Sequence, residues 1–172
     1  MKERLLTQSA GQRDERSRRI AEKVMRLQQF YKAANIHFYM SMSSEVETGF
    51  LMDRAFGLGK HVLLPVTDLR NKELDWYEVK SRRGLKKGAL GILEPDISAA
   101  GKFAGAAECV LVPGLVFDNK NYRIGRGAGL YDRFLSKLPP YVYKVGLAFS
   151  FQVIPEIPVN KHDVQLDEVI TD

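Results

Sequence analysis

The stretch Tyr-Arg-Ile-Gly-Arg-Gly-Ala-Gly-Leu-Tyr-Asp-Arg-Phe-Leu (residues 122–135) follows an apolar run at 109–117 and carries glycines at alternate positions. The run predicts a buried strand, and the apolar spacing over 130–138 predicts an amphipathic helix after the glycines. Glycines let the backbone turn sharply and bring bare N–H groups close to an anion. Arg123 and Arg126 add full positive charges to the same loop, so the segment suits a polyphosphate.

Two familiar phosphate-binding patterns do not match this loop. No Gly-Lys-Ser/Thr follows the glycines, which excludes the P-loop pattern. The third glycine also comes one residue too early for a dinucleotide fingerprint. Taken alone, the glycines therefore fit either an anion-binding loop or an ordinary turn before a helix.

Length and composition set the class of protein. The 172 residues fit one domain, and 45% of them are hydrophobic, which is enough to fill a core. No apolar run is long enough to span a bilayer, and the charged N-terminus lacks an apolar signal core. The single cysteine, Cys109, excludes an internal disulfide framework and lies in the apolar run, where we expect a buried thiol. We expect a cytoplasmic protein whose net charge of +5 favours anionic partners.

The order of the expected elements indicates the fold. Ser9 and Gln12 resemble a capping box, and Thr48 is placed to cap a second helix. In chain order we expect a helix at 9–34, a strand at 36–42, a helix at 48–58, strands at 61–66 and 74–79, an irregular loop at 81–95, a strand at 108–117, a helix at 131–138, and strands at 142–149 and 168–171. Strands that alternate with helices predict an α/β sandwich around a mostly parallel sheet, in a single domain over 1–172. The glycine loop and Glu45 both follow strands, so one crevice at the carboxyl ends of the strands would hold both.

An ordered set of short motifs resembles the 5-formyltetrahydrofolate cyclo-ligase family, also called 5,10-methenyltetrahydrofolate synthetases. Any one motif is common, but their order from about residue 9 to the C-terminus is specific. The motifs are Glu45-Val46-Glu47-Thr48, Gly59-Lys60 before Leu64-Pro65, Gly91-Ile92-Leu93-Glu94-Pro95, Pro113-Gly114, Phe117-Asp118, Arg123 to Gly127, Gly129 to Arg133, Ser150-Phe151-Gln152, His162-Asp163 and Asp167 to Thr171.

The resemblance implies a three-layer α/β fold and an ATP-driven ring closure. In that reaction the formyl oxygen on N5 of the folate attacks the γ-phosphate, and N10 then closes the 5,10-methenyl ring as phosphate departs. Such chemistry needs positioning and charge neutralisation more than a protein nucleophile. The sequence agrees, because it shows no Ser-His-Asp or Cys-His signature and its three histidines lack zinc-ligand spacing.

The resemblance also implies a nucleotide site. Arg126 is the residue we expect to neutralise the β- or γ-phosphate and to act in catalysis. The family usually has Lys-x-x-x-Arg near its N-terminus, and Lys2 and Arg4 are the nearest substitutes here. The family usually has two tyrosines before the loop aspartate, and the first of them is leucine in this chain. The predicted ATP-binding residues are Lys2, Arg4, Arg123, Ile124, Gly125, Arg126, Gly127, Ala128, Gly129, Leu130 and Tyr131.

Folate and metal residues follow from the same resemblance. Glu45 matches the family's glutamate for the pterin end, where a carboxylate can accept two N–H bonds. The other predicted substrate contacts are Met40, Trp76 and Phe117, although core packing explains the last two equally well. Asp132 and Asp163 match magnesium carboxylates. A simpler role for Asp132 is pairing with the helix dipole.

Two other readings remain open from the sequence. One is a diverged, non-catalytic member of the same fold that binds RNA through its basic faces, although no RNA-binding aromatic motif is present. The other is a different nucleotide-dependent enzyme with the same loop. For the favoured reading the cofactors are ATP and Mg²⁺, and the substrate is a reduced folate, including polyglutamylated forms whose tail could meet the basic residues at 80–87. We expect a monomer that binds neither nucleic acid nor membrane.

Overall fold

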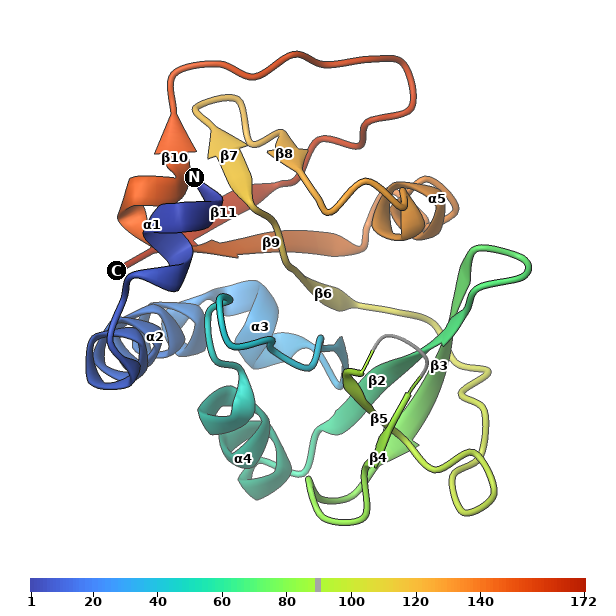
Figure 1. The fold of residues 1–172 in the computed structure, drawn as a ribbon. Coiled ribbons are helices and arrows are strands. Elements are labelled where there is room, and N and C mark those ends of the chain that lie inside the picture. Colours follow the sequence, from blue (N-terminus) through green and yellow to red (C-terminus); the bar gives the residue numbers. More distant parts are fainter. Residues whose placement is uncertain (89–90) are drawn as a thin grey trace.

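A mostly parallel β-sheet forms the centre of the computed structural model, which describes residues 1–88 and 91–172 (Figure 1). Within that part of the chain, six strands lie in the order β11-β9-β6-β1-β2-β3. The strands are β1 (Asn35–His37), β2 (His61–Asp68), β3 (Glu73–Val79), β6 (Cys109–Val112), β9 (Tyr143–Ala148) and β11 (Glu168–Thr171). Neighbouring strands are parallel except for the antiparallel pair β2 and β3. The predicted fold class is confirmed.

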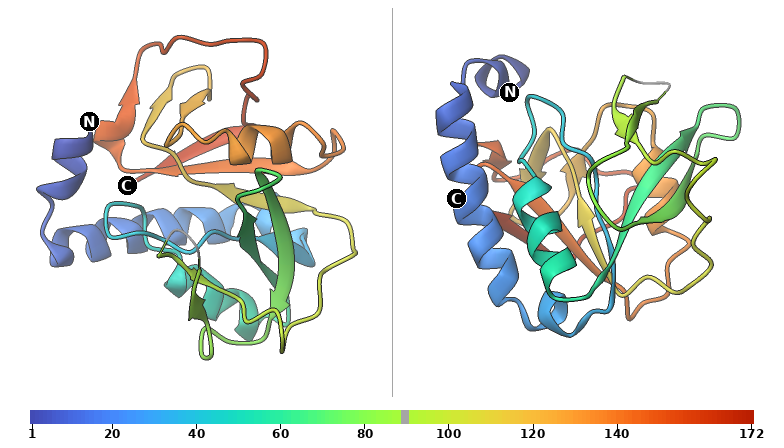
Figure 2. Two further views of the ribbon diagram at one scale, coloured as in Figure 1. Left: turned by 45° about the vertical axis from the view of Figure 1, so that its right-hand side comes forward. Right: turned by 90° about the horizontal axis from the view of Figure 1, so that it is seen from below.

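Helices and smaller sheets cover the two faces of this sheet (Figure 2). The remaining elements are α1 (Lys2–Leu6), α2 (Ala10–Arg26), α3 (Gln28–Lys32), α4 (Gly49–Gly57), α5 (Leu130–Leu135), a short 3₁₀ helix η1 (Ser150–Gln152), and the strands β4 (Lys86–Lys87), β5 (Leu93–Glu94), β7 (Val116–Asp118), β8 (Arg123–Ile124) and β10 (Val153–Ile154). Helix α2 packs against β11 and α4, and α4 packs against β2. Helix α5 packs against β3, and β10, β7 and β8 form a separate small sheet.

Strand β6 shows why the sheet is buried on both faces. Cys109 and Leu111 join the core cluster that includes residues of α2 and α4, whereas Val110 and Val112 join a second cluster with residues near α5. None of the four side chains is exposed to solvent. A continuous apolar run is typical of a parallel strand that is covered from both sides. The buried thiol predicted at Cys109 is therefore confirmed.

The first long helix begins as the sequence predicts but ends earlier. The amide of Gln12 donates to the Ser9 hydroxyl at 3.2 Å, and the amide of Ser9 donates to the Gln12 side chain at 3.1 Å, so the capping box is present. Helix α2 stops at Arg26 because Leu27 adopts an extended conformation. The single helix expected over 9–34 is therefore wrong. The break lets Phe30 of α3 enter the core.

Several boundaries differ for reasons of tertiary structure. Of the strand expected over 36–42, only the part within β1 pairs with neighbouring strands, and the rest of the segment is irregular. Thr48 lies at the start of α4 but its hydroxyl donates to the carbonyl of Tyr39, so the predicted cap is wrong. The Glu47 carboxylate accepts from the amide of Gly49 in its place. The expected loop at 81–95 contains the small ribbon β4–β5, and its residues 89–90 lie outside the described part of the chain.

The strand expected over 108–117 is two strands separated by Pro113 and Gly114. Strand β6 ends at Val112, and β7 leaves the main sheet to pair with β8 and β10. Proline lacks the N–H that a central strand needs, which explains the division. The helix expected over 131–138 is also shorter, because α5 ends at Leu135.

Two further findings concern the helices. Helix α1 was not predicted, and its Leu5 is buried in the core. Among the residues that the structure describes, no helix combines the length and apolar character needed to cross a bilayer.

Phe117 fixes the position of β7 relative to the main sheet. Its ring is fully buried and lies against the backbone of Gly114 on one side and Gly146 of β9 on the other. A Cβ atom at Gly114 would approach the ring to 2.6 Å, and one at Gly146 would approach it to 2.7 Å. Both distances are far below van der Waals contact, so the ring requires glycine at both positions.

We expect Gly146→Ala to lower the free energy of unfolding by about 1–3 kcal/mol, because the added methyl overpacks the core beside Phe117. Gly11→Ala in α2 is the matched control, since a Cβ there meets nothing within 4 Å. That control should raise the free energy of unfolding by about 0.5–1 kcal/mol. Urea denaturation measures both, and equal stability of the two variants would contradict the packing argument.

His37 of β1 is buried among aromatic rings. Its ring centroid lies 4.4 Å from that of Trp76 and 5.8 Å from that of Phe134, with Phe103 slightly further away. Its Nδ1 has no hydrogen-bond partner in the described residues. Burial lowers the pKa of His37 from 6.5 to about 3, because the charged imidazolium would lose its hydration.

This shift predicts a pH dependence of stability. Below pH 6.5 the unfolded chain binds a proton at His37 that the folded protein excludes down to about pH 3. The His37 contribution is therefore complete above pH 6.5 and is lost as the pH falls through this window, at up to about 1.4 kcal/mol per pH unit. His37→Phe should flatten the curve of unfolding free energy between pH 6 and pH 5. Parallel curves for the variant and the wild type would contradict this interpretation.

Candidate functional site

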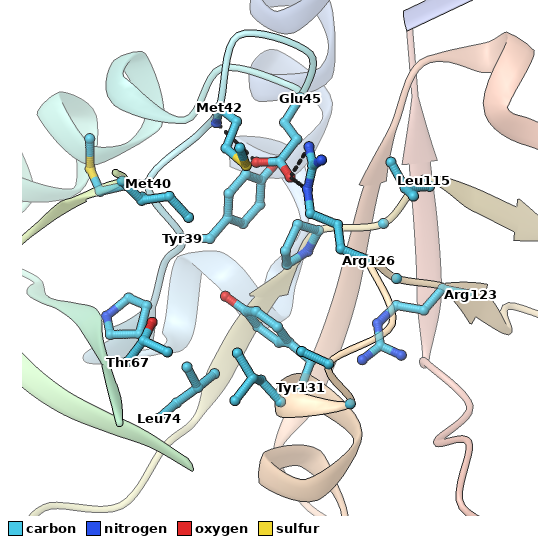
Figure 3. Close-up of a pocket in the computed structure, with 18 of the residues that line it drawn as sticks. Tyr39, Met40, Met42, Glu45, Thr67, Leu74, Leu115, Arg123, Arg126 and Tyr131 are labelled. Carbon is cyan, nitrogen blue, oxygen red and sulfur yellow. Dashed lines mark hydrogen bonds and ion pairs between the residues drawn. The ribbon is translucent and has the colours of Figure 1, made fainter. Parts of the chain in front are cut away.

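A pocket opens where the glycine loop, the segment after β1 and the ends of β2 and β6 come together (Figure 3). One wall is the loop from β8 to α5, and the opposite wall carries Glu45. The predicted crevice at the carboxyl ends of parallel strands is therefore present. The lining residues are Tyr39, Met40, Met42, Glu45, Pro65, Thr67, Leu74, Ile92, Leu93, Glu94, Pro113, Gly114, Leu115, Arg123, Gly125, Arg126, Ala128, Gly129, Leu130, Tyr131 and Asp132.

The glycine loop has the backbone freedom that its sequence predicts. Gly127 and Gly129 have φ angles of +96° and +63°, which favour glycine. Gly125 has no such requirement, and a Cβ there would meet no atom of residues 1–88 and 91–172 within 4 Å. The loop backbone at Gly125 is therefore open to a ligand, and glycine at this position is not explained by packing within the protein.

Arg126 crosses the mouth of the pocket to the opposite wall. Its Nε and Nη2 atoms donate to Oε1 of Glu45 at 3.3 and 3.2 Å (Figure 3). Its Nη2 also donates to the hydroxyl of Ser44 at 3.1 Å. The second carboxylate oxygen of Glu45 accepts from the amide of Met42 at 3.0 Å. The two residues are 81 positions apart in the sequence. The structure thus joins the predicted phosphate residue to the predicted pterin residue.

Arg123 is a buried cation paired with Asp132. Its Nη1 donates to Oδ1 of Asp132 at 2.7 Å, and only 2% of its side chain is exposed. Within the described residues its Nε has no partner. The same Asp132 oxygen accepts from the amide of Val164 at 3.4 Å. Asp132 therefore lines the pocket as predicted, whereas the Asp163 carboxylate accepts from the amide of Asn160 at 2.7 Å and is not among the lining residues.

Tyr131 points its hydroxyl into the pocket, on the side where Tyr39 and Thr67 lie (Figure 3). The hydroxyl is buried and has no hydrogen-bond partner in the described part of the chain. The Tyr39 hydroxyl, in contrast, donates to the carbonyl of Val46 at 3.0 Å. Burial, and then the nearby Glu45 carboxylate, raise the pKa of both tyrosines well above the usual range. Tyr131 therefore offers a neutral hydroxyl without a protein partner.

The other predicted site residues divide into two groups. Met40 and most of the loop line the pocket, whereas Ile124 and Gly127 do not. Trp76 and Phe117 are buried in the core, so core packing accounts for both and the structure does not bring them to the pocket.

Lys2 and Arg4 also lie outside the pocket lining. Both are exposed on α1, and the guanidinium of Arg4 lies 4.8 Å from the ring of Phe151. Neither residue is therefore among those that line the pocket beside the glycine loop.

Sequence reasoning missed several residues of the pocket. Glu94 is a buried carboxylate that accepts from the amide of Thr67 at 3.1 Å, and both residues line the pocket. Glu94 and Pro113 belong to motifs that carried the family resemblance, but those motifs suggested no contact role. Tyr39 of the lining, and Ser44, which bonds Arg126 from beside the pocket, had no signal apart from their closeness to Glu45 in the sequence.

The fold and the pocket define the class: an α/β protein with a ligand pocket between a glycine-rich basic loop and a neighbouring strand end. The sequence model of the 5-formyltetrahydrofolate cyclo-ligase family matches residues 1–172. The 5-formyltetrahydrofolate cyclo-ligase of Mus musculus is 31% identical over 180 residues, which cover 99% of this chain and 89% of the mouse protein. The chain belongs to the 5-formyltetrahydrofolate cyclo-ligase family.

Solved structures agree with this assignment. The NMR structure of Aquifex aeolicus 5,10-methenyltetrahydrofolate synthetase matches with a TM-score of 0.82 and 30% identity, over 98% of this chain and 84% of that chain. The 5,10-methenyltetrahydrofolate synthetase of Mycoplasma pneumoniae matches with a TM-score of 0.76 over 98% of this chain and 92% of that chain. Its 23% identity supports the fold alone.

The two pocket tyrosines provide a matched pair of variants. Tyr39→Phe removes a hydrogen bond that is made and should lower the free energy of unfolding by about 1 kcal/mol. Tyr131→Phe removes a hydroxyl that has no protein partner, so it should leave the free energy of unfolding unchanged or raise it by about 1 kcal/mol. Urea denaturation of the ligand-free proteins measures both. A loss in Tyr131→Phe equal to that in Tyr39→Phe would show that its hydroxyl is already satisfied.

Proposed function

We propose that the protein cyclises 5-formyltetrahydrofolate to 5,10-methenyltetrahydrofolate at the expense of ATP, with release of ADP and phosphate. The observation that carries this proposal is the meeting of Arg126 and Glu45 over one pocket, in a chain that belongs to the cyclo-ligase family. One wall of the pocket supplies a cation and open backbone for phosphate, and the other supplies a carboxylate for a ring with N–H donors. The reaction needs both ligands in contact.

The chemistry follows from this juxtaposition. The formyl oxygen attacks the γ-phosphorus of ATP, and ADP leaves. N10 then attacks the activated formyl carbon and loses its proton, and phosphate departs with the former formyl oxygen. Arg126 neutralises charge on the transferring phosphoryl group, and Glu45 holds the pterin end so that the formyl oxygen faces the phosphate.

The carboxylates near α5 fit a magnesium ion held together with phosphates. Mg²⁺ in nucleotide sites takes one or two protein carboxylates plus phosphate oxygens. Asp132 lines the pocket and would be one such carboxylate, and the resemblance supplies Asp163 as the second. Among the described residues no group of three or more potential ligands forms a complete protein cage. When bound, the ion would neutralise phosphate charge. Arg123 holds Asp132 in place through their ion pair.

Other partner assignments remain predictions from the sequence. Three cations of the basic segment at 80–87 already have protein partners: Lys80 pairs with Glu78, Arg82 with Asp53, and Lys86 with Asp96. This pairing reduces the charge available for a polyglutamate tail. The cytoplasmic location, the monomeric state and the lack of nucleic-acid binding are likewise unaltered predictions.

The test is the absorbance of the methenyl product formed from 5-formyltetrahydrofolate, with and without ATP and magnesium. Product should form only when ATP is present, in a one-to-one ratio with released phosphate. Absence of product, with both ligands bound, would overturn the proposed function. Product without ATP would overturn the phosphorylation step.

Gly125→Ala tests the loop within the same assay. A Cβ at this position meets no protein atom within 4 Å, so the variant should be as stable as the wild type. The methyl should block the approach of phosphate to the backbone and lower the affinity for ATP by roughly 10- to 100-fold. Gly11→Ala in α2 is the control and should keep wild-type turnover. Unchanged ATP affinity in Gly125→Ala, measured by calorimetry with magnesium, would remove this backbone from the nucleotide site.

A further inference from the structure

The ion pair between Arg126 and Glu45 occupies both of the groups that the two ligands need. Both nitrogens of Arg126 that face Glu45 donate to the same oxygen, Oε1. The proposed function assigns Arg126 to phosphate and Glu45 to the pterin ring. In the ligand-free protein, therefore, each binding group is the partner of the other.

The two partners differ in how firmly they are held. The side chain of Glu45 is 12% exposed and is also held by the amide of Met42. The side chain of Arg126 is 44% exposed, and no atom of the described residues lies within 4 Å of the Cβ position at either flanking glycine, Gly125 or Gly127. Glu45 is therefore a fixed acceptor, and Arg126 is the partner that can turn away.

In the described residues, Arg126 also makes the side-chain hydrogen bonds that join the glycine loop to the opposite wall. Its guanidinium reaches Glu45 and Ser44, both on the segment after β1. The neighbouring cations do not reach that segment, since Arg123 pairs with Asp132 and Arg133 donates to the carbonyls of Lys72 and Ala128. Release of Arg126 thus removes these hydrogen bonds between the loop and the wall that carries Glu45.

We propose that this ion pair couples the binding of ATP and folate, so that each ligand tightens the binding of the other. The inference rests on the proposed function. A folate that takes Glu45 must break the pair, and an ATP that takes Arg126 must break the same pair. The first ligand to bind must break the ion pair, so its binding free energy is reduced by the free energy of that pair. The second ligand binds after the pair is broken and is not weakened in this way.

Thermodynamic linkage makes the effect symmetric, and the exposure of the ion pair sets its size. The factor by which folate tightens ATP binding must equal the factor by which ATP tightens folate binding. The pair is charge-assisted but partly exposed, which places the factor at the lower end of the usual range, roughly fivefold. A surface pair that neither ligand disturbs would give a factor of one.

The experiment is calorimetric titration of a non-hydrolysable ATP analogue with magnesium, with and without saturating 5-formyltetrahydrofolate. In the wild type, folate should tighten the analogue roughly fivefold. Glu45→Gln weakens the ion pair. The folate-free variant should therefore bind the ATP analogue more tightly than the folate-free wild type, and folate should raise that affinity little further. Glu47→Gln is the matched control, because Glu47 bonds Ser41 and Gly49 rather than Arg126. It should show the wild-type coupling.

The outcomes separate this inference from the proposed function. Equal affinity for the analogue with and without folate in the wild type would overturn the coupling, even if the methenyl product forms. Weaker or unchanged binding of the analogue to folate-free Glu45→Gln, with a normal thermal melt, would overturn it as well. A wild-type protein that fails to bind either ligand would overturn the proposed function together with the coupling.

Discussion

The turn at Pro113 and Gly114, where the chain leaves the central sheet, is the constraint on which the site depends. It directs β7 and β8 away from the sheet and so places the glycine loop opposite Glu45. Gln152 holds this turn from beneath: its amide nitrogen donates to the carbonyls of Gly114 and Leu115 at 2.9 and 3.2 Å. A buried carbonyl left without a partner costs about 1–3 kcal/mol, so the bond to Leu115 in particular stabilises the turn. The loop is thus free at its glycines but rigid at its base.

A second set of buried hydrogen bonds fixes the turn between β7 and β8, at the other end of β7. The Asp118 carboxylate is 1% exposed and accepts from the amides of Lys120, Tyr122 and Ile157. It therefore closes the β7–β8 turn and attaches the chain after β10 to that turn. Since the same C-terminal segment brings Val164 to Asp132, the Asp132 end of the pocket is assembled from three separate stretches of sequence. A buried carboxylate with several N–H donors is well suited to this purpose.

The sequence predicted features that are local or follow from chain order. The capping box at Ser9 depends on neighbours three residues apart, and the parallel sheet follows from the alternation of strands and helices. It did not distinguish a ring in the core from a ring in a pocket, because Trp76 and Phe117 have the same apolar surface in either place. The pairing of Arg126 with Glu45 depends on tertiary structure across 81 positions, so no local pattern contains it. The family motifs indicated both residues but not their contact.

The thiol of Cys109 has a practical consequence. Burial raises its pKa to about 12, so the reactive thiolate is almost absent at neutral pH while the sheet is closed. Its strand lies between β1 and β9, in the middle of the sheet. A thiol reagent can modify it only when that centre opens to water. Cys109 is the sole cysteine in the chain. The rate at which a thiol reagent modifies it therefore reports how often the centre of the sheet opens, without any engineered label.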